Sequence, residues 1–254
     1  MPLVLRTRKG DESQMRVKDK VAIVVGGASG IGRATAQLLA REGAKVMIAN
    51  LHVEKANQIA DGIRANGGEA ATIKADMTME KEVAEMVRAT LDRFGRIDIL
   101  ANIAGGSVRG PFAESTREMW DRMIDLNLNG ARNCTRAVIN HMMERGSGKI
   151  VNVSSIAAVD GAATAVAYAA AKAGIIGFTK ALALEMGPYG IQVNCITPGG
   201  TSSERMLAGI KKGLKFDPDK LATPEEMANV ILLLVSDELS HITGENFIVA
   251  VRNK

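Results

Sequence analysis

The chain has 254 residues, of which 46% are hydrophobic and 24% are charged, so it is long enough for one α/β domain with a large core. Its formal net charge of +4 arises mainly in residues 1–20, which hold six Lys/Arg and three Asp/Glu, while the rest holds 26 basic and 25 acidic residues. A nearly neutral body argues against a DNA-binding surface, so a nucleic-acid binder is an alternative that only the basic N-terminal segment motivates. No apolar run reaches the roughly 18 residues of a membrane span and no signal-peptide pattern is present, so we expect no membrane partner.

In chain order, residues 1–14 lack periodicity, and we expect them to form a disordered extension before a single domain over residues 15–254. Buried strands are expected near residues 21–25, 45–49, 70–74, 97–101, 149–153, 192–197 and 246–250. Helices are expected near residues 30–42, 53–66, 79–94, 116–144, 165–187 and 224–236. This alternation predicts a doubly wound, Rossmann-like parallel sheet with helices on both faces. Ligands of such sheets bind beyond the carboxyl ends of the strands.

A glycine-rich turn, Gly26-Gly27-Ala28-Ser29-Gly30-Ile31-Gly32, follows the first buried strand and opens the first helix. Strand, turn and helix together form a site where backbone N–H groups and the helix dipole receive a pyrophosphate. Gly26 would permit the tight turn, Gly30 the close approach of phosphate, and Gly32 the packing of helix on strand. The alternative is a flexible surface loop.

Tyr168 and Lys172 are four residues apart in a predicted helix, so the phenol and the ammonium project from the same face. An unperturbed tyrosine, with a pKa of about 10, is a poor acid or base at neutral pH. A neighbouring cation stabilises the phenolate and lowers that pKa, as general acid–base catalysis requires. Ser155, thirteen residues before Tyr168, would hydrogen-bond the substrate oxygen. The alternative for the Tyr–Lys pair is a solvated helix face.

The remaining reactive side chains do not form a recognisable site. Cys134 and Cys195 have neither CxxC spacing nor the pattern of a disulfide framework, so we expect packing residues and a reducing, cytoplasmic setting. His52, His141 and His241 are scattered, so we expect no metal site.

Several further motifs follow in a fixed order, and with them the chain resembles the short-chain dehydrogenases/reductases from about Lys18 to Ile248. They are Asn102-Ile103-Ala104-Gly105, Leu126-Asn127-Leu128-Asn129-Gly130, Asn152-Val153-Ser154-Ser155, Pro198-Gly199, Pro224-Glu225-Glu226 and Ile242-Thr243-Gly244. The resemblance implies an NAD(P)-dependent oxidoreductase that moves a hydride between nicotinamide and a secondary alcohol or ketone. An alternative is a catalytically silent member that binds a dinucleotide as a scaffold or regulator.

The resemblance also implies roles for individual residues. Tyr168 would be the acid or base, Lys172 would lower its pKa and bind the nicotinamide ribose, and Ser155 would hold the substrate oxygen. Asn127 would bend its helix and seat a water next to Lys172. The residues expected at the cofactor are Gly26, Ser29, Gly30, Ile31, Gly32, Asn50, Leu51, Asp76, Met77, Asn102, Ala104, Gly105, Tyr168, Lys172, Pro198, Gly199, Thr201 and Ser203.

Cofactor identity depends on Asn50, which stands where an acidic residue usually binds the adenosine ribose 2′-OH. Asparagine can bond the hydroxyl but lacks the charge that repels a 2′-phosphate. Relatives that use NADP typically carry Arg or Lys at the positions of Leu51 or Ser29. The sequence therefore favours NAD and leaves NADP open, with Arg33 or His52 able to reverse the preference.

Two regions bear on substrate and assembly. Residues 201–222 resemble a lid and are rich in Lys/Arg, which would suit an acidic substrate such as an acyl-CoA thioester or a carboxylate; a solvated helix face explains the same charges. The helix with Tyr168 is apolar on more than one face, so we expect it to pack against a second copy in a dimer or tetramer. The C-terminal residues 249–254 depart from the family pattern, as does Val25, where threonine is usual.

Overall fold

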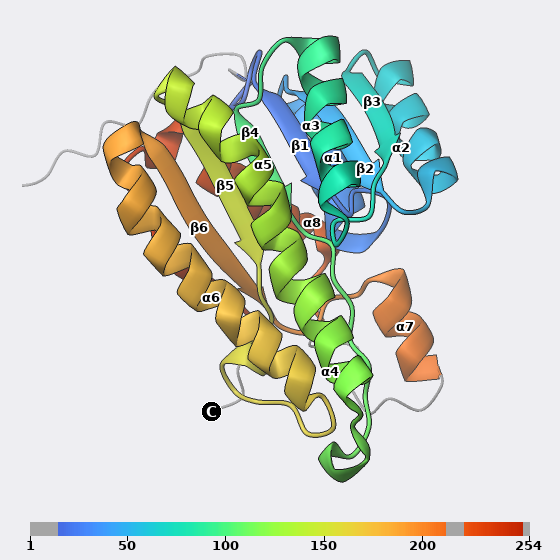
Figure 1. Ribbon diagram of the computed structural model, residues 1–254. Coiled ribbons are helices and arrows are strands. Elements are labelled where there is room, and N and C mark those ends of the chain that lie inside the picture. The colour runs from blue at the N-terminus through green and yellow to red at the C-terminus, as the bar shows by residue number, and fades with distance from the viewer. Residues whose placement is uncertain (1–14, 212–220, 251–254) are drawn as a thin grey trace, which may run out of the picture.

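The computed structural model describes residues 15–211 and 221–250, and in this part of the chain seven parallel strands form one sheet (Figure 1). Their order is β3-β2-β1-β4-β5-β6-β7, and every neighbouring pair is parallel. The strands are β1 Val21–Val25, β2 Lys45–Asn50, β3 Glu69–Lys74, β4 Ile99–Asn102, β5 Gly148–Val153, β6 Ile191–Pro198 and β7 Asn246–Val249. The chain order reverses between β1 and β4, which confirms the predicted doubly wound sheet.

Helices cover both faces of this sheet, each with its own apolar cluster. One face packs against α1 Gly30–Arg41, α2 Val53–Ala65 and α8 Pro224–Val235, and the other packs against α3 Glu80–Phe94, α5 Gly130–Arg145 and α6 Val166–Met186. Figure 1 shows α5 and α6 crossing in front of the sheet, with α8 behind it. Because both faces are covered, strands such as β1 are buried at every residue, which explains their unbroken apolar sequence.

The expected helix over residues 116–144 is not regular throughout. It comprises α4 Arg117–Ile124, a π-helical segment Asp125–Asn129, and α5. A further helix, α7 Glu204–Lys211, lies in the predicted lid. Short 3₁₀ turns span Phe112–Glu114, Ile156–Ala158, Gly187–Tyr189 and Asp237–Leu239. The predicted N-terminal extension, residues 212–220 of the lid and residues 251–254 lie outside the described residues.

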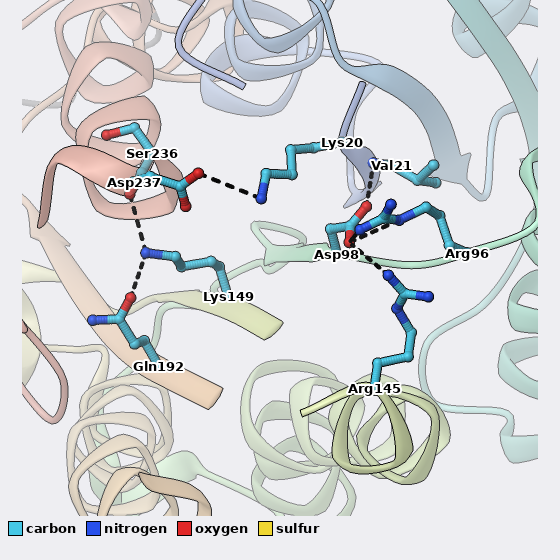
Figure 2. Close-up of polar contacts among 9 residues, drawn as sticks. All are labelled: Lys20, Val21, Arg96, Asp98, Arg145, Lys149, Gln192, Ser236 and Asp237. Carbon is cyan, nitrogen blue, oxygen red and sulfur yellow. Dashed lines mark hydrogen bonds and ion pairs between the residues drawn. The ribbon is translucent and has the colours of Figure 1, made fainter. Parts of the chain in front are cut away.

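Charged side chains join the amino ends of the strands, at the edge opposite the glycine turn (Figure 2). Asp98 is 5% exposed, and its carboxylate accepts hydrogen bonds from the Val21 backbone N–H at 2.8 Å and from Arg96 Nε at 3.0 Å. Arg145, at the end of α5, lies 3.8 Å from the same carboxylate. One buried charge therefore ties the start of β1 to the start of β4 and to a covering helix.

We predict that Asp98→Asn lowers the free energy of unfolding by about 2 kcal/mol, since it removes the charge that two arginines and a buried N–H share. Urea denaturation at fixed protein concentration measures the change. Asp121→Asn is the control, because the Arg117–Asp121 pair is exposed on both sides and should contribute no more than about 0.5 kcal/mol. Equal effects of the two substitutions would contradict the anchoring role of Asp98.

Candidate active site

The glycine turn is tightly packed, and the structure shows why three of its positions require glycine. Gly26 has φ +85°, and a Cβ there would lie 2.8 Å from Cα of Ala104. Gly30 has φ +47°, and a Cβ on Gly32 would lie 2.0 Å from the carbonyl oxygen of Gly26. Side chains at these positions would clash with backbone or require a left-handed conformation. The structure therefore does not support the alternative of a flexible surface loop.

The amino end of α1 opens on this turn without a side-chain cap. Ser29 is the N-cap residue, and its hydroxyl makes no capping hydrogen bond. The first N–H groups of a helix lack intrahelical acceptors, so an uncapped end suits an anionic ligand. The turn thus fits the pyrophosphate of a dinucleotide.

A cavity of about 490 Å³ lies beside the turn, at the carboxyl ends of β1, β2 and β4. It occupies the point where the strand order reverses, which is where open α/β sheets bind ligands. Of the residues predicted at the cofactor, those that line it are Gly26, Ser29, Gly30, Ile31, Gly32, Asn50, Leu51, Asp76, Met77, Ala104, Gly105, Thr201 and Ser203.

Five residues predicted at the cofactor are not among the described residues that line this cavity: Asn102, Tyr168, Lys172, Pro198 and Gly199. Asn102 belongs instead to a buried polar network, in which its Nδ2 donates to Asn152 Oδ1 at 2.9 Å. Asn152 in turn donates to Thr179 Oγ1 at 3.0 Å. The network joins β4 and β5 to α6, so the side chain of Asn102 connects these elements inside the protein.

Lys172, which the sequence predicts to be catalytic, is held by the end of β5. Lys172 is 4% exposed, and its Nζ donates to the Val153 carbonyl at 2.8 Å and lies 6.0 Å from the centroid of the Tyr168 ring. Ser154 Oγ donates to the Lys172 carbonyl at 2.7 Å, which fixes α6 against the strand. The next residue, Ser155, accepts a hydrogen bond from the Ala157 N–H at 3.3 Å, so its own O–H can donate to a ligand.

Asn127 lies in the π-helical segment, where π-bulges are often found at functional sites. It is 1% exposed, and its side-chain amide forms a pair of hydrogen bonds with the Gly106 backbone, at 2.8 and 3.1 Å. Its Nδ2 also donates to the Met123 carbonyl at 3.0 Å. Asn127 therefore clamps the loop that follows β4 to the helix.

Gly105 is the point at which these groups converge. A Cβ on this residue would lie 2.8 Å from Asn127 Oδ1 and 3.1 Å from Lys172 Nζ. Gly105 also lines the cavity beside the glycine turn. The loop after β4 thus lies between the cavity beside the glycine turn and Lys172.

Sequence reasoning missed several residues of the site. Lys55, Ile103, Leu126 and Glu204 also line the cavity, and Glu204 forms an ion pair at 3.0 Å with Arg33, which joins α7 to α1. The signal for Lys55 was its place in the first turn of α2, which begins three residues after Asn50. Val153 and Ser154 contribute to the lysine site next to the predicted Ser155.

Neither cysteine has the properties of a reactive thiol. Burial raises the pKa of Cys134 to about 12 and that of Cys195 to about 11, so both remain thiols at neutral pH. They pack in the apolar layer against the sheet, as predicted. Among the described residues, no group of three His, Cys, Asp or Glu side chains could hold a metal ion.

Comparison with known proteins decides the family. A profile of the short chain dehydrogenase family matches residues 20–213. The chain belongs to this family. It is 38% identical over 236 residues, covering 91% of this chain and 95% of the relative, to (2S)-((R)-hydroxy(phenyl)methyl)succinyl-CoA dehydrogenase subunit BbsD of Thauera aromatica.

Two further comparisons agree. The chain is 39% identical to a 3-oxoacyl-(acyl-carrier-protein) reductase of Synechocystis, with 90% of this chain and 94% of the relative covered. An actinorhodin polyketide ketoreductase solved with NADPH superposes with a TM-score of 0.86 at 30% identity, covering 91% of this chain and 95% of that structure. The predicted family is confirmed, and this short-chain dehydrogenase is an NAD(P)-dependent oxidoreductase by class.

We predict that Gly105→Ala lowers kcat/KM of this short-chain dehydrogenase about 100-fold, because the new Cβ displaces the clamped Asn127 amide and the Lys172 ammonium. Steady-state kinetics give the effect, and thermal unfolding shows whether the fold persists. Gly110→Ala in the same loop is the control, since a Cβ there meets nothing within 4 Å. A fully active Gly105→Ala enzyme would show that the convergence on this loop has no catalytic importance.

Proposed function

We propose that this short-chain dehydrogenase interconverts a secondary alcohol and a ketone, with Tyr168 as the group that moves the proton. The observation that carries the proposal is the buried Lys172 ammonium, held 6.0 Å from the Tyr168 ring centroid. The ammonium therefore lies beside the side chain to which we assign the proton transfer. Ser155 lies just beyond the end of β5, and its O–H is available to a substrate oxygen.

The chain's own residues handle the proton, while a bound NAD(P) supplies the hydride acceptor or donor. In alcohol oxidation, the Tyr168 phenolate takes the hydroxyl proton, and Ser155 donates a hydrogen bond to the oxygen as it becomes a carbonyl. In ketone reduction, the Tyr168 phenol returns that proton. Lys172 keeps a positive charge beside Tyr168 in both directions, and Asn127 holds the loop against which the ammonium packs.

The cofactor we favour is NAD(H). The glycine turn, the uncapped end of α1 and the adjoining cavity fit a dinucleotide. At the two positions where NADP-using relatives typically carry a cation, this chain has Ser29 and Leu51. Asp76 also lines the cavity, where we assign it to the adenine amino group.

For the substrate, we favour the alcohol or ketone of an acyl thioester or carboxylic acid. Two relatives are named for acyl thioesters, a succinyl-CoA derivative in one and an acyl-carrier-protein conjugate in the other. The basic residues predicted in the lid support an acidic substrate, and the one whose side chain the structure describes, Lys211 at the end of α7, is exposed.

We predict that Tyr168→Phe lowers kcat by about 10²–10⁴-fold and changes dinucleotide affinity by no more than a few-fold, because the phenol moves a proton and contributes little binding. A panel of secondary alcohols with NAD, followed at the absorbance of reduced nicotinamide, measures turnover. Tyr189→Phe, which alters the only other tyrosine, in an exposed turn after α6, is the control and should be fully active.

Two outcomes would count against the proposal. If Tyr168→Phe kept more than a few per cent of the rate, the tyrosine would not be the acid or base. If the wild-type protein bound dinucleotide but turned over no substrate in the panel, the catalytically silent scaffold would become the better description.

The partner we propose is a second copy of this chain, packed against α6. By length and composition, residues Val166–Tyr189 could cross a membrane, with mean hydropathy of 1.2, but core helices of soluble proteins pass the same test. One side of α6 packs on β6 and carries Lys172, which favours a protein partner for the other side. That other side exposes Ala170, Ala173 and Leu184, the last of them 83% exposed. A tetramer, the larger of the two assemblies expected from the sequence, is our expectation here.

We predict that light scattering at micromolar concentration shows at least a dimer and that Ala173→Arg separates the copies that pack through α6, so that a dimer becomes monomers and a tetramer becomes dimers, because a long charged side chain prevents close helix packing. Met79→Arg, at the exposed start of α3, should leave the assembly intact and serves as the control. A monomeric wild-type protein would refute the α6 interface.

A further inference from the structure

Two loops at the carboxyl edge of the sheet lie side by side before they enter their helices (Figure 1). One follows β4 and leads to α4, and the other follows β5 and leads to α6. The Gly110 backbone N–H donates to the Thr164 carbonyl at 2.8 Å. One residue earlier in each loop, Arg109 Nη1 donates to the Ala163 carbonyl at 3.5 Å. An arginine therefore lies against the segment that leads into the helix of Tyr168.

The segment that contacts this arginine has a constrained backbone. Thr164 has φ +65°, which is in the left-handed region. That conformation is costly for a β-branched residue and persists where the surrounding structure holds it, often at functional sites. The hydrogen bond from Gly110 is such a contact. The Ala163 carbonyl is thus held in place for Arg109.

The side chains of Arg109 and Tyr168 both lie outside the small apolar pocket between these loops and α4. The described residues that line this pocket include Val108, Gly110 and Val166. Arg109 stands between the first two in sequence and Tyr168 follows the third by two residues, yet neither lines the pocket. An anion bound by the guanidinium can therefore belong to the same ligand whose hydroxyl or carbonyl reaches Tyr168.

The Arg109 guanidinium has donors available for such an anion. Among the described residues, it forms no ion pair within 4.0 Å, and its hydrogen bond goes to the Ala163 carbonyl. A guanidinium has five N–H donors, so the edge formed by Nε and Nη2 remains available. This edge has the fork geometry that binds both oxygens of a carboxylate. Arg109 is exposed, so a substrate can reach it.

We propose that Arg109 determines substrate specificity by binding a free carboxylate of the substrate while the alcohol or ketone of the same molecule meets Tyr168. This role rests on the proposed function in one respect, namely that Tyr168 acts on that alcohol or ketone. It narrows the substrate class to hydroxy acids and oxo acids, including thioesters that keep a second carboxyl group free. Arg109 is a residue that the sequence motifs did not indicate.

Matched substrates that differ in charge test this role. The hydroxy acids β-hydroxybutyrate, γ-hydroxyvalerate and δ-hydroxycaproate, which vary the distance between hydroxyl and carboxylate, are each compared with the corresponding primary amide, which has a similar shape and no charge. Oxidation with NAD is followed at the absorbance of reduced nicotinamide. We expect the wild-type protein to prefer at least one acid over its amide by about tenfold or more in kcat/KM. In Arg109→Gln, kcat/KM for that acid should fall about 10–100-fold, mainly through KM, and the value for its amide should change less than about threefold.

Two further variants separate recognition of the carboxylate from general effects of charge. Arg109→Lys keeps the charge but loses the fork geometry, so it should retain part of the preference for the acid. Arg117→Gln removes the same charge from the exposed start of α4, where Arg117 pairs with Asp121, and should leave the kinetics of both substrates unchanged.

The possible results distinguish the role of Arg109 from the proposed function. If the wild-type protein oxidised secondary alcohols but preferred no acid over its amide, or if Arg109→Gln lowered kcat/KM equally for acid and amide or for neither, the carboxylate subsite would be wrong and the oxidoreductase function would stand. Absence of turnover with every acid, amide and uncharged alcohol would overturn the subsite and the proposed function together.

Discussion

Two loops in this protein approach each other more closely than side chains would allow, and the rest of the site depends on that approach. The turn after β1 and the loop after β4 meet where a Cβ on Gly26 would lie 2.8 Å from Cα of Ala104. The Ala104 N–H donates to the Val25 carbonyl at 2.9 Å, which holds the loop there. Gly105 follows directly, against Asn127 and Lys172. The loop that packs against Lys172 is thus held by the same contact that shapes the cavity beside the glycine turn.

Burying the lysine requires compensation, since a desolvated ammonium without partners is costly. The Val153 carbonyl accepts from Lys172 Nζ, and the Ser154 hydroxyl holds the lysine's own backbone. Both come from the end of β5, so the strand that neighbours β4 positions the ammonium next to the loop after β4. The four-residue spacing on α6 places Lys172 near Tyr168, and the end of β5 fixes where the ammonium lies.

The sequence allowed prediction of the strands, their parallel order and the glycine turn, because hydrophobic runs and glycine spacing are local signals. The predicted carboxyl ends of the strands then indicated which residues lie together at one edge of the sheet. The family resemblance implied a bend at Asn127, but the π-helical form of Asp125–Asn129 was not predicted, because it accompanies contacts of Asn127 with Gly106 that are distant in the sequence. The side-chain direction of Asn102 and the reach of Lys55 into the cavity depend on tertiary packing, which a motif does not specify.

The amino and carboxyl ends of the strands have different roles in this protein. At the amino edge, Asp98 joins the first residue of β1 to the segment that leads into β4, so these two strands share one buried anchor (Figure 2). At the carboxyl edge, Gly26 directly follows β1 and packs against Ala104 in the loop after β4, where a Cβ on Gly26 would clash. Such packing tolerates little displacement of one strand along the other. The anchor at one edge therefore preserves the register on which the close approach at the other edge depends, so stability and catalysis are linked through two short strands.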